Sequence, residues 1–290
     1  MIKNKTVDVG QVWWFWFTTN AFAVDKRLRH IFRMLPHDPR CKFCNAPFQG
    51  VGGTIVRVFF GKQRSLLNPR FCNICDIAAR EFPGGAEVEM SMLFVDVRGS
   101  TALSEKMSAT EFSKLINRFY IESTRVITAE DGLVEKLAGD AVAAFWGAGF
   151  AGPDYVKRTI KVAQNLSRVM QRQEIPVGIG VHTGLAFFGV LGTAEGLTDI
   201  TAIGDEVNTA ARLQEFTRQF NDFPLIMSKA VWVELATHPD HRTIINLGRL
   251  QIRGKKEGLD AFGYNPFADE GPLPEAQEEG LSPLQRIKGV

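Results

Sequence analysis

The sequence predicts an α+β fold, in which a split β-α-β sheet follows a small module that is stabilised by a metal ion bound to four cysteines. Three observations support this prediction. Strand-like and helix-like patterns alternate over residues 87–265 in the order β-α-β-β-α-β, which is the order of a ferredoxin-like sheet. All four cysteines lie before that region, in two C-x-x-C pairs. The 290 residues are 45% apolar, which excludes wholesale disorder and allows a sizeable core.

Each element of the α/β region has its own signal. An apolar run predicts a buried first strand, and a capping box formed by Ser108 and Glu111 begins the first long helix. A tight turn at Ala138-Gly139-Asp140 joins the next two strands. The predicted elements in order are strand Met90–Val97, helix 108–129, two strands within Leu133–Trp146, helix 154–172, strand Val177–His182 and helix Glu206–Phe216.

The chain divides into four regions by composition. An aromatic and then basic segment comes first, followed by the four-cysteine module with its connector, the α/β region and a loose tail rich in Pro and Glu; the bounds are residues 1–40, 41–86, 87–265 and 266–290. Turn formers at Pro83-Gly84-Gly85 mark the boundary before the α/β region. Between the cysteine pairs, Gly-rich turns flank residues 54–60, where we expect a short strand.

The aromatic run Val12–Phe17 holds three Trp within four residues. A helix that spans a bilayer needs about 20 apolar residues, and Thr18-Thr19-Asn20 interrupts this run. The run could contact a membrane surface without spanning it. We expect its Trp side chains to pack on their own domain or on a partner subunit.

The small net charge of +2 hides an asymmetry. Residues 1–86 contain 13 basic and 5 acidic side chains, a net charge of +8, and the remaining residues contain 21 and 27, a net charge of −6. A basic segment of this kind could contact a membrane surface, nucleic acid or an acidic domain. The sequence offers no strong sign of nucleic-acid binding, and docking on the chain's own acidic domain is at least as plausible.

Two carboxylates are placed for metal binding. Asp96 ends the first predicted strand and Asp140 lies in the hairpin turn, and these two strands can lie side by side in a split β-α-β sheet. Paired carboxylates suit Mg²⁺, and Gly99, Ser100 and Thr101 then open a helix whose backbone N–H groups attract phosphate. The alternative is structural, with Asp96 as a helix cap and Asp140 as a turn residue.

Three segments together resemble the catalytic segments of class III nucleotidyl cyclases. They are Phe94-Val-Asp-Val-Arg-Gly-Ser-Thr101, Glu135-Lys-Leu-Ala-Gly-Asp140 and Ile203-Gly-Asp-Glu-Val-Asn-Thr-Ala-Ala-Arg-Leu213, and the similarity spans about residues 87–265. The resemblance implies that Asp96, Val97 and Asp140 bind two Mg²⁺ or Mn²⁺ ions. It further implies that Asn208 and Arg212 orient the ribose and stabilise the transition state.

The resemblance also implies which residues bind the substrate. Lys136 matches the purine-reading lysine of adenylate cyclases, where guanylate cyclases typically have Glu. Thr201 lies where many relatives have Asp, as in a subgroup often described as responsive to bicarbonate. Arg253 lies where relatives place a phosphate-binding lysine, and a solvated strand-end Arg is the alternative.

The implied reaction converts ATP to cyclic AMP and pyrophosphate. In this family the site lies between two cyclase domains, so we expect a homodimer with ATP as substrate. A guanylate cyclase is the first alternative. The second is a catalytically silent protein in which a zinc module binds nucleic acid and the cyclase-like domain senses nucleotide.

The four cysteines form the pairs Cys41-Lys-Phe-Cys44 and Cys72-Asn-Ile-Cys75, with 27 residues between them. Two such pairs typically close a tetrahedral Zn²⁺ site. An iron–sulfur cluster and redox pairing are the alternatives. Because an enzyme that uses ATP belongs in a reducing compartment, we expect a cytoplasmic protein and a regulatory or dimer-setting role for the module.

Other conspicuous side chains are expected to be structural. His182 lies on an apolar strand, so we interpret it as a satisfied core residue. The pairs Phe187-Phe188 and Phe145-Trp146 are expected to be core or dimer contacts.

Overall fold

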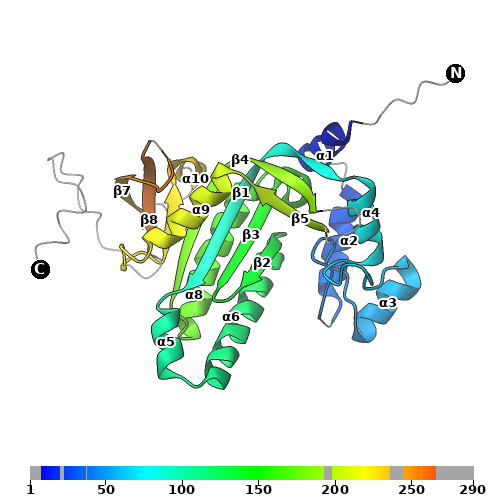
Figure 1. The fold of residues 1–290 in the computed structure, drawn as a ribbon, viewed down its shortest axis with the longest axis horizontal. Helices are drawn as coiled ribbons and strands as arrows, with labels where there is room; N and C mark the ends of the chain where they lie inside the picture. The colour runs from blue at the N-terminus through cyan, green and yellow to red at the C-terminus, as the bar shows by residue number, and fades with distance from the viewer. Residues whose placement is uncertain are drawn as a thin grey trace, which may run out of the picture.

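The computed structural model describes residues 8–19, 23–36, 38–192, 198–235, 244–255 and 257–265. The predicted tail 266–290 lies outside these residues. The described residues form one eight-stranded sheet, with a helical N-terminal module beside one end of it (Figure 1).

The centre of the sheet confirms the predicted split β-α-β arrangement. Strands β1 (Gly84–Val97), β2 (Leu133–Ala138), β3 (Ala141–Gly147) and β4 (Val177–Gly192) lie in the order β2-β3-β1-β4, and each pair is antiparallel. Strand β6 (Leu225–Ser228) then runs parallel to β4 and is followed by β8 (Leu259–Tyr264) and β7 (Ile244–Leu250). Strand β5 (Thr198–Ile203) pairs with the second half of β4.

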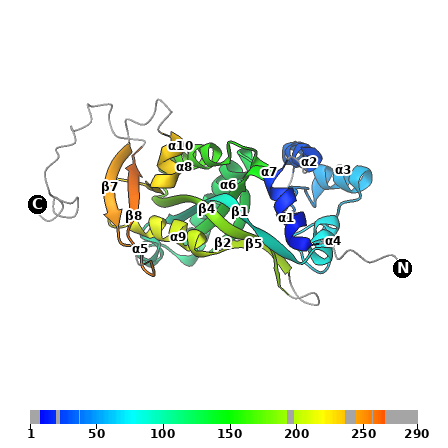
Figure 2. The same cartoon turned by 90° about the horizontal axis from the view of Figure 1, so that it is seen from above.

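Helices cover both faces of the sheet. The long helices α6 (Ala109–Ala129) and α8 (Tyr155–Arg172) lie on one face, and α9 (Asp205–Phe216) crosses the other (Figure 2). Gly180 of β4 allows α9 to approach, because a Cβ there would lie 2.3 Å from the backbone N of Gln214. Three short helices, α5 (Ser100–Lys106), α7 (Ala148–Ala151) and α10 (Lys229–Leu235), complete the domain.

The N-terminal module is helical, and the expected strand over residues 54–60 is wrong. Its helices are α1 (Val9–Thr18), α2 (Ala23–Met34), α3 (Gly50–Phe60) and α4 (Asn73–Glu81). The β-branched run in α3 favours a strand by propensity, but tertiary packing overrides it. A Cβ on Gly52 would lie 2.2 Å from the Pro36 carbonyl oxygen, so only glycine fits this approach. Gly61 ends the helix at a φ of +62°.

The expected boundary at Pro83-Gly84-Gly85 coincides with the start of a strand. Strand β1 begins at Gly84, six residues before the predicted start at Met90. Gly85 is paired with Gly189 of β4, and a Cβ on Gly85 would lie 2.3 Å from the Phe188 carbonyl oxygen. The glycines therefore serve a close strand crossing, and α4 leads into the sheet after only two residues.

Part of the aromatic run packs against the rest of the chain, as expected. Trp13 and Phe17 of α1 are buried, with Phe17 in edge contact with Phe150 and Phe188. The indole Nε1 of Trp13 donates to the Phe82 carbonyl at 3.0 Å. The neighbouring Trp14 and Phe15 are exposed. None of the described helices combines the length and the apolar character that crossing a bilayer requires.

Candidate active site and metal centre

The structure brings the two predicted carboxylates to adjacent strand ends. Asp96 is the penultimate residue of β1 and pairs with Ala141 of β3. The backbone N–H of Val97 donates to the Asp140 carbonyl at 3.0 Å, and the Ser100 hydroxyl donates to the Asp140 carboxylate. The residue that caps α5 is Gly99, so Asp96 is not the helix cap that the structural alternative required.

The electrostatics at Asp96 favour a bound cation. Its side chain is 15% exposed, and Oδ1 is buried without a hydrogen-bond partner among the described residues. Burial, and then the negative charge of Asp140, raise the pKa of Asp96 to about 6, while Arg218 at 3.3 Å acts in the opposite direction. A hard cation such as Mg²⁺ or Mn²⁺ stabilises a buried, unpaired carboxylate oxygen that lies beside a second carboxylate.

A cavity adjoins the Asp140 carboxylate. It has a volume of about 500 Å³ and is lined by Asp140, Gly139, Ser100 and Thr101 together with side chains of α5 and α6. Gly99 precedes it at a φ of +64°, a conformation that favours glycine. The predicted phosphate-binding residues Gly99, Ser100 and Thr101 therefore lie beside the aspartate pair.

The predicted base-reading residues form a second group. Lys136 is exposed on β2, and Thr201 lies on β5, where its hydroxyl donates to Glu135 Oε1 at 2.9 Å. The β2–β3 ladder shifts register between Val134 and Lys136, so Glu135 has no partner residue on β3. Such a bulge redirects side chains, and here the Glu135 side chain reaches Thr201 on another strand.

Helix α9 carries the predicted transition-state residues. Asn208 is exposed, and Arg212, one turn later, pairs with Glu215 at 2.6 Å. Within the part of the chain that the structure describes, no hydrogen bond or ion pair joins the aspartate pair to Lys136, Thr201, Asn208 or Arg212. Arg253 lies in an exposed turn before β8. Among the described residues, the two halves of the predicted site are therefore not bonded to one another, although Arg218 lies 3.3 Å from Asp96.

The comparisons with known proteins identify the sheet domain. Residues 85–260 match the model of the adenylate and guanylate cyclase catalytic domain. The chain belongs to this family. The predicted resemblance and the fold class are thereby confirmed, and the four-cysteine module lies outside the matched residues.

Several curated relatives are similar to this cyclase domain. The adenylate cyclase of Anabaena cylindrica is 28% identical over 184 residues, which is 60% of this chain and 36% of that protein. Adenylate cyclase 1 of Rhizobium meliloti is 27% identical over 184 residues, 60% of this chain and 27% of that protein. The chain thus spans about a third of the length of these relatives.

Solved structures show the same fold. A bacterial light-regulated adenylyl cyclase is 28% identical with a TM-score of 0.54, covering 62% of this chain and 53% of that one. The adenylyl cyclase CyaB from P. aeruginosa is 21% identical with a TM-score of 0.51, covering 67% of this chain and 98% of that one. The second likeness concerns the fold alone.

Sequence reasoning missed two basic residues of the cyclase domain. Lys255, two residues after Arg253, is bound to Asp205 at 3.0 Å and to Glu206 at 3.2 Å at the start of α9. Its position two residues after Arg253, in the same turn, could have indicated Lys255 as a candidate. Arg98 follows the metal-binding segment and donates to the carbonyls of Asn221 and Phe223 at 3.0 and 2.7 Å.

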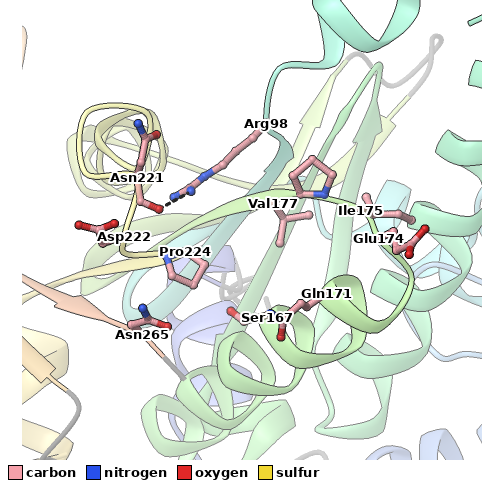
Figure 3. Close-up of a pocket in the computed structure, with 11 residues that line it drawn as sticks. Arg98, Ser167, Gln171, Glu174, Ile175, Val177, Asn221, Asp222, Pro224 and Asn265 are labelled. Atoms are coloured by element: carbon pink, nitrogen blue, oxygen red, sulfur yellow. Dashed lines mark hydrogen bonds between the residues drawn. The ribbon is translucent and has the colours of Figure 1, made fainter. Parts of the chain in front are cut away.

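Arg98 also lines a second cavity of about 460 Å³, between the start of β4 and the loop that precedes β6 (Figure 3). Figure 3 shows its guanidinium reaching from the end of β1 to Asn221. Nη1 and Nη2 of Arg98 both bond backbone carbonyls, so we assign this residue to holding the strand end in place.

His182 is the satisfied core residue that its position predicts. It is 4% exposed, its Nδ1 lies 2.8 Å from the Ser228 hydroxyl, and its Nε2 contacts Glu206. Burial lowers the pKa of His182, although Glu206 acts in the opposite direction. Trp146, Phe145 and Phe188 are likewise buried in the core.

The four cysteines converge as predicted. The Sγ atoms of Cys41, Cys44, Cys72 and Cys75 all lie within 4.8 Å of one another, and those of Cys44 and Cys72 are 3.7 Å apart. Four thiolates about 2.3 Å from one tetrahedral ion would lie about 3.8 Å apart. An iron–sulfur cubane, in which each thiolate binds a different iron, holds its thiolates farther apart. The spacing therefore fits a single ion.

The charge of the thiolates acts on two cationic side chains of the module. Arg29 is buried and stacks over Phe150 at 5.4 Å, and its guanidinium has no hydrogen-bond partner among the described residues. Burial lowers the pKa of Arg29, whereas Asp131 and then the thiolates raise it. The four thiolates also raise the pKa of Lys62 against the effect of its burial. A divalent ion with four thiolates would have a charge of −2, which Arg29 and Lys62 would offset.

Proposed function

We propose that this cyclase domain is an adenylate cyclase, which converts ATP to 3′,5′-cyclic AMP and pyrophosphate. The observation that carries the proposal is the pair Asp96 and Asp140 at adjacent strand ends, with a buried carboxylate oxygen that has no hydrogen-bond partner among the described residues. Two relatives named above are adenylate cyclases, and Lys136 is the residue type that suits adenine. Adenine N1 accepts a hydrogen bond from an ammonium group, whereas guanine N1 carries a hydrogen.

The reaction is an intramolecular displacement at phosphorus. The ribose 3′-oxygen forms a bond to the α-phosphorus, the bond to the bridging oxygen of the β-phosphate breaks, and the 3′-hydroxyl proton passes to solvent. Bound at Asp96 and Asp140, two Mg²⁺ or Mn²⁺ ions would lower the pKa of the 3′-hydroxyl and neutralise phosphate charge. The Val97 side chain has no atom that can bind a metal ion, so only its backbone oxygen could be a metal ligand.

The other residues of this chain position the substrate. Ser100 orients the Asp140 carboxylate, and Thr101 lines the adjoining cavity, where the phosphates would lie. Asn208 would orient the ribose, and Arg212 would leave Glu215 to neutralise charge on the phosphorus in the transition state. Arg253, or Lys255 in the same turn, would bind the terminal phosphates.

We further propose a homodimer with two equivalent sites. One chain would supply the aspartates, and its partner would supply Lys136, Thr201, Asn208 and Arg212. The absence of a direct bond between these sets among the described residues supports this arrangement. The apolar side chains Leu137, Leu185 and Ile203, each about half exposed, also suit an interface. A catalytically active monomer in sedimentation at the assay concentration would contradict it.

Turnover measurements test the proposed activity. Wild-type protein should form cyclic AMP from ATP with Mg²⁺ or Mn²⁺, and Asp140→Ala should form none. Equal product from both proteins would reject the mechanism. A preference for GTP in the wild type would favour the guanylate cyclase alternative, and Lys136→Glu should shift the preference toward GTP. A wild type that binds nucleotide without product would favour the silent alternative.

For the four-cysteine module we propose a structural Zn²⁺ ion and a regulatory role, with the thiols kept reduced in the cytoplasm. The close approach of the four Sγ atoms supports a single ion, and Arg29 and Lys62 balance its charge. Metal analysis of the purified protein, followed by cyclase assays of Cys44→Ser, tests both parts. Unchanged metal content and unchanged activity would reject the proposal.

A further inference from the structure

The four-cysteine module contacts the strands that carry the base-reading residues. Lys42 lies between Cys41 and Cys44, and its side chain is only 5% exposed. Its Nζ donates to Asp199 Oδ1 at 2.7 Å and to the Ile200 carbonyl at 2.9 Å, both on β5. The same ammonium lies 3.6 Å from Glu135 Oε1 on β2. One buried cation of the module therefore bridges β5 and β2.

Two further side chains of the module secure this contact. Arg70 Nη1 donates to Asp199 Oδ2 at 2.6 Å, and its Nη2 donates to the Glu135 carbonyl at 2.7 Å. The amide of Asn68 donates to the Thr198 carbonyl at 2.5 Å. All three residues lie in or between the C-x-x-C pairs, so the folding of the module around its metal determines their positions.

Glu135 controls the direction of the Thr201 hydroxyl. A hydroxyl has one hydrogen and two lone pairs, so a free Thr could donate to a guanine or accept from an adenine. Thr201 lies 2.9 Å from the Glu135 carboxylate, which can only accept, and 3.4 Å from its next acceptor, the Ala202 carbonyl. With its hydrogen committed to Glu135, the Thr201 oxygen presents lone pairs to the substrate.

Adenine and guanine differ in the group that such a hydroxyl would meet. The group at C6 is an amino donor in adenine and a carbonyl acceptor in guanine. A hydroxyl that presents only lone pairs accepts from the adenine amino group and repels the guanine oxygen. We propose that Glu135, held in place by Lys42 and Arg70 of the four-cysteine module, sets the preference for adenine over guanine by fixing the direction of the Thr201 hydroxyl.

This inference rests on the proposed function, because Thr201 must face the purine. It makes Glu135 a positioning residue and makes the module part of the base-recognition site. Loss of the metal would release Lys42 from its place between two ligands, and with it the Glu135 carboxylate. Discrimination between purines would then depend on the metal, which gives the proposed regulation a physical route.

The test compares ATP with GTP in wild type and Glu135→Gln. Two ratios are measured: kcat/KM for ATP over kcat/KM for GTP, and the dissociation constant of GTP over that of ATP. The glutamine amide can donate to Thr201, which frees the hydroxyl to donate to guanine, so both ratios should fall about five- to tenfold, the value of one hydrogen bond. An unchanged pair of ratios would overturn the inference while leaving the cyclase activity established.

A double-mutant cycle separates this role from a structural one. In a Thr201→Val background there is no hydroxyl to orient, so Glu135→Gln should no longer change either ratio. An equal change with and without the hydroxyl would overturn the inference. Glu81→Gln, the same substitution at an exposed residue of α4, is the matched control and should leave both ratios unchanged.

The contribution of the module is tested through Lys42. Lys42→Met should lower both ratios in the same direction as Glu135→Gln while retaining the bound metal. Wild type that has been stripped of the cysteine-bound metal by a chelator, and then freed of the chelator and returned to Mg²⁺, should show the same change. If both ratios stay at their wild-type values in Lys42→Met and in the metal-stripped wild type, the module does not hold Glu135. If the wild type converts neither nucleotide, the proposed activity fails, and the dissociation constants still decide the inference.

Discussion

Replacement of Asp96 by Asn should stabilise the metal-free protein while abolishing activity. The Asp96 carboxyl is only 15% exposed, and burial together with Asp140 raises its pKa from 3.8 to about 6. A rise of this size corresponds to about 3 kcal/mol of unfavourable free energy for the ionised group at neutral pH. Residual solvent screening reduces this, so we expect a gain of about 1–2 kcal/mol in the free energy of unfolding.

The pH dependence has a definite sign. In the native metal-free state Asp96 keeps its proton up to about pH 6, whereas in the unfolded chain it loses the proton near pH 3.8. Between these values the native state binds more protons, so rising pH lowers the stability of the wild type. Asn cannot ionise. The advantage of Asp96→Asn should therefore be near zero below pH 4 and complete above pH 6.

Urea unfolding in the presence of a chelator, at several pH values, measures this difference. In thermal melts at pH 7 the gain should appear as a rise of about 3–6 °C. Asp154→Asn, an exposed residue whose side chain makes no capping bond, is the control and should show no such pH-dependent gain. A variant that is less stable than the wild type at pH 7 without metal would refute the reasoning.

Three further predictions concern the cysteines, the dimer and the core. Cys44→Ser should bind less than one metal ion per chain in elemental analysis and melt at a lower temperature; full metal content would contradict the four-thiolate site. Asp140→Ala and Arg212→Ala, each inactive alone, should recover about a quarter of wild-type activity when mixed in equal amounts, because half of the dimers then contain one complete site. No recovery in a verified mixed dimer would rule out the shared site. Gly180→Ala should lose about 1–3 kcal/mol in urea unfolding, because α9 lies where the new Cβ would be; an unchanged midpoint would show that α9 shifts freely.

The charge asymmetry of the sequence finds a structural explanation within the chain. The basic first part of the chain meets acidic residues of the cyclase domain through Lys42 and Arg70 on Asp199, and through Arg33 on Asp131 at 3.5 Å. Composition predicted that such docking was at least as plausible as a membrane or nucleic-acid contact. It could not identify the partners, because which charges meet depends on how the module folds.

Periodicity predicted the central elements well and the module poorly. The helices at 109–129 and 155–172 and the hairpin around Asp140 lie where their patterns placed them. Helix α3 was expected to contain a strand, because Thr, Ile and Val dominate it and propensity was the only guide. Its glycines were interpreted as turns, whereas Gly52 serves a close approach to the Pro36 carbonyl.

The sequence by itself determined the residue types of the candidate site and their order along the chain. Asp96, Asp140, Lys136 and the cysteine pairs were recognisable because their chemistry requires those side chains at short, regular spacings. Only the tertiary structure decided that Glu135 of β2 reaches Thr201 of β5, and that Lys42 of the module reaches both of these strands. These contacts join residues 66 to 157 positions apart, and a strand bulge and a folded metal-binding loop bring them together. Local pattern carries no information at that range, because packing alone determines which surfaces meet.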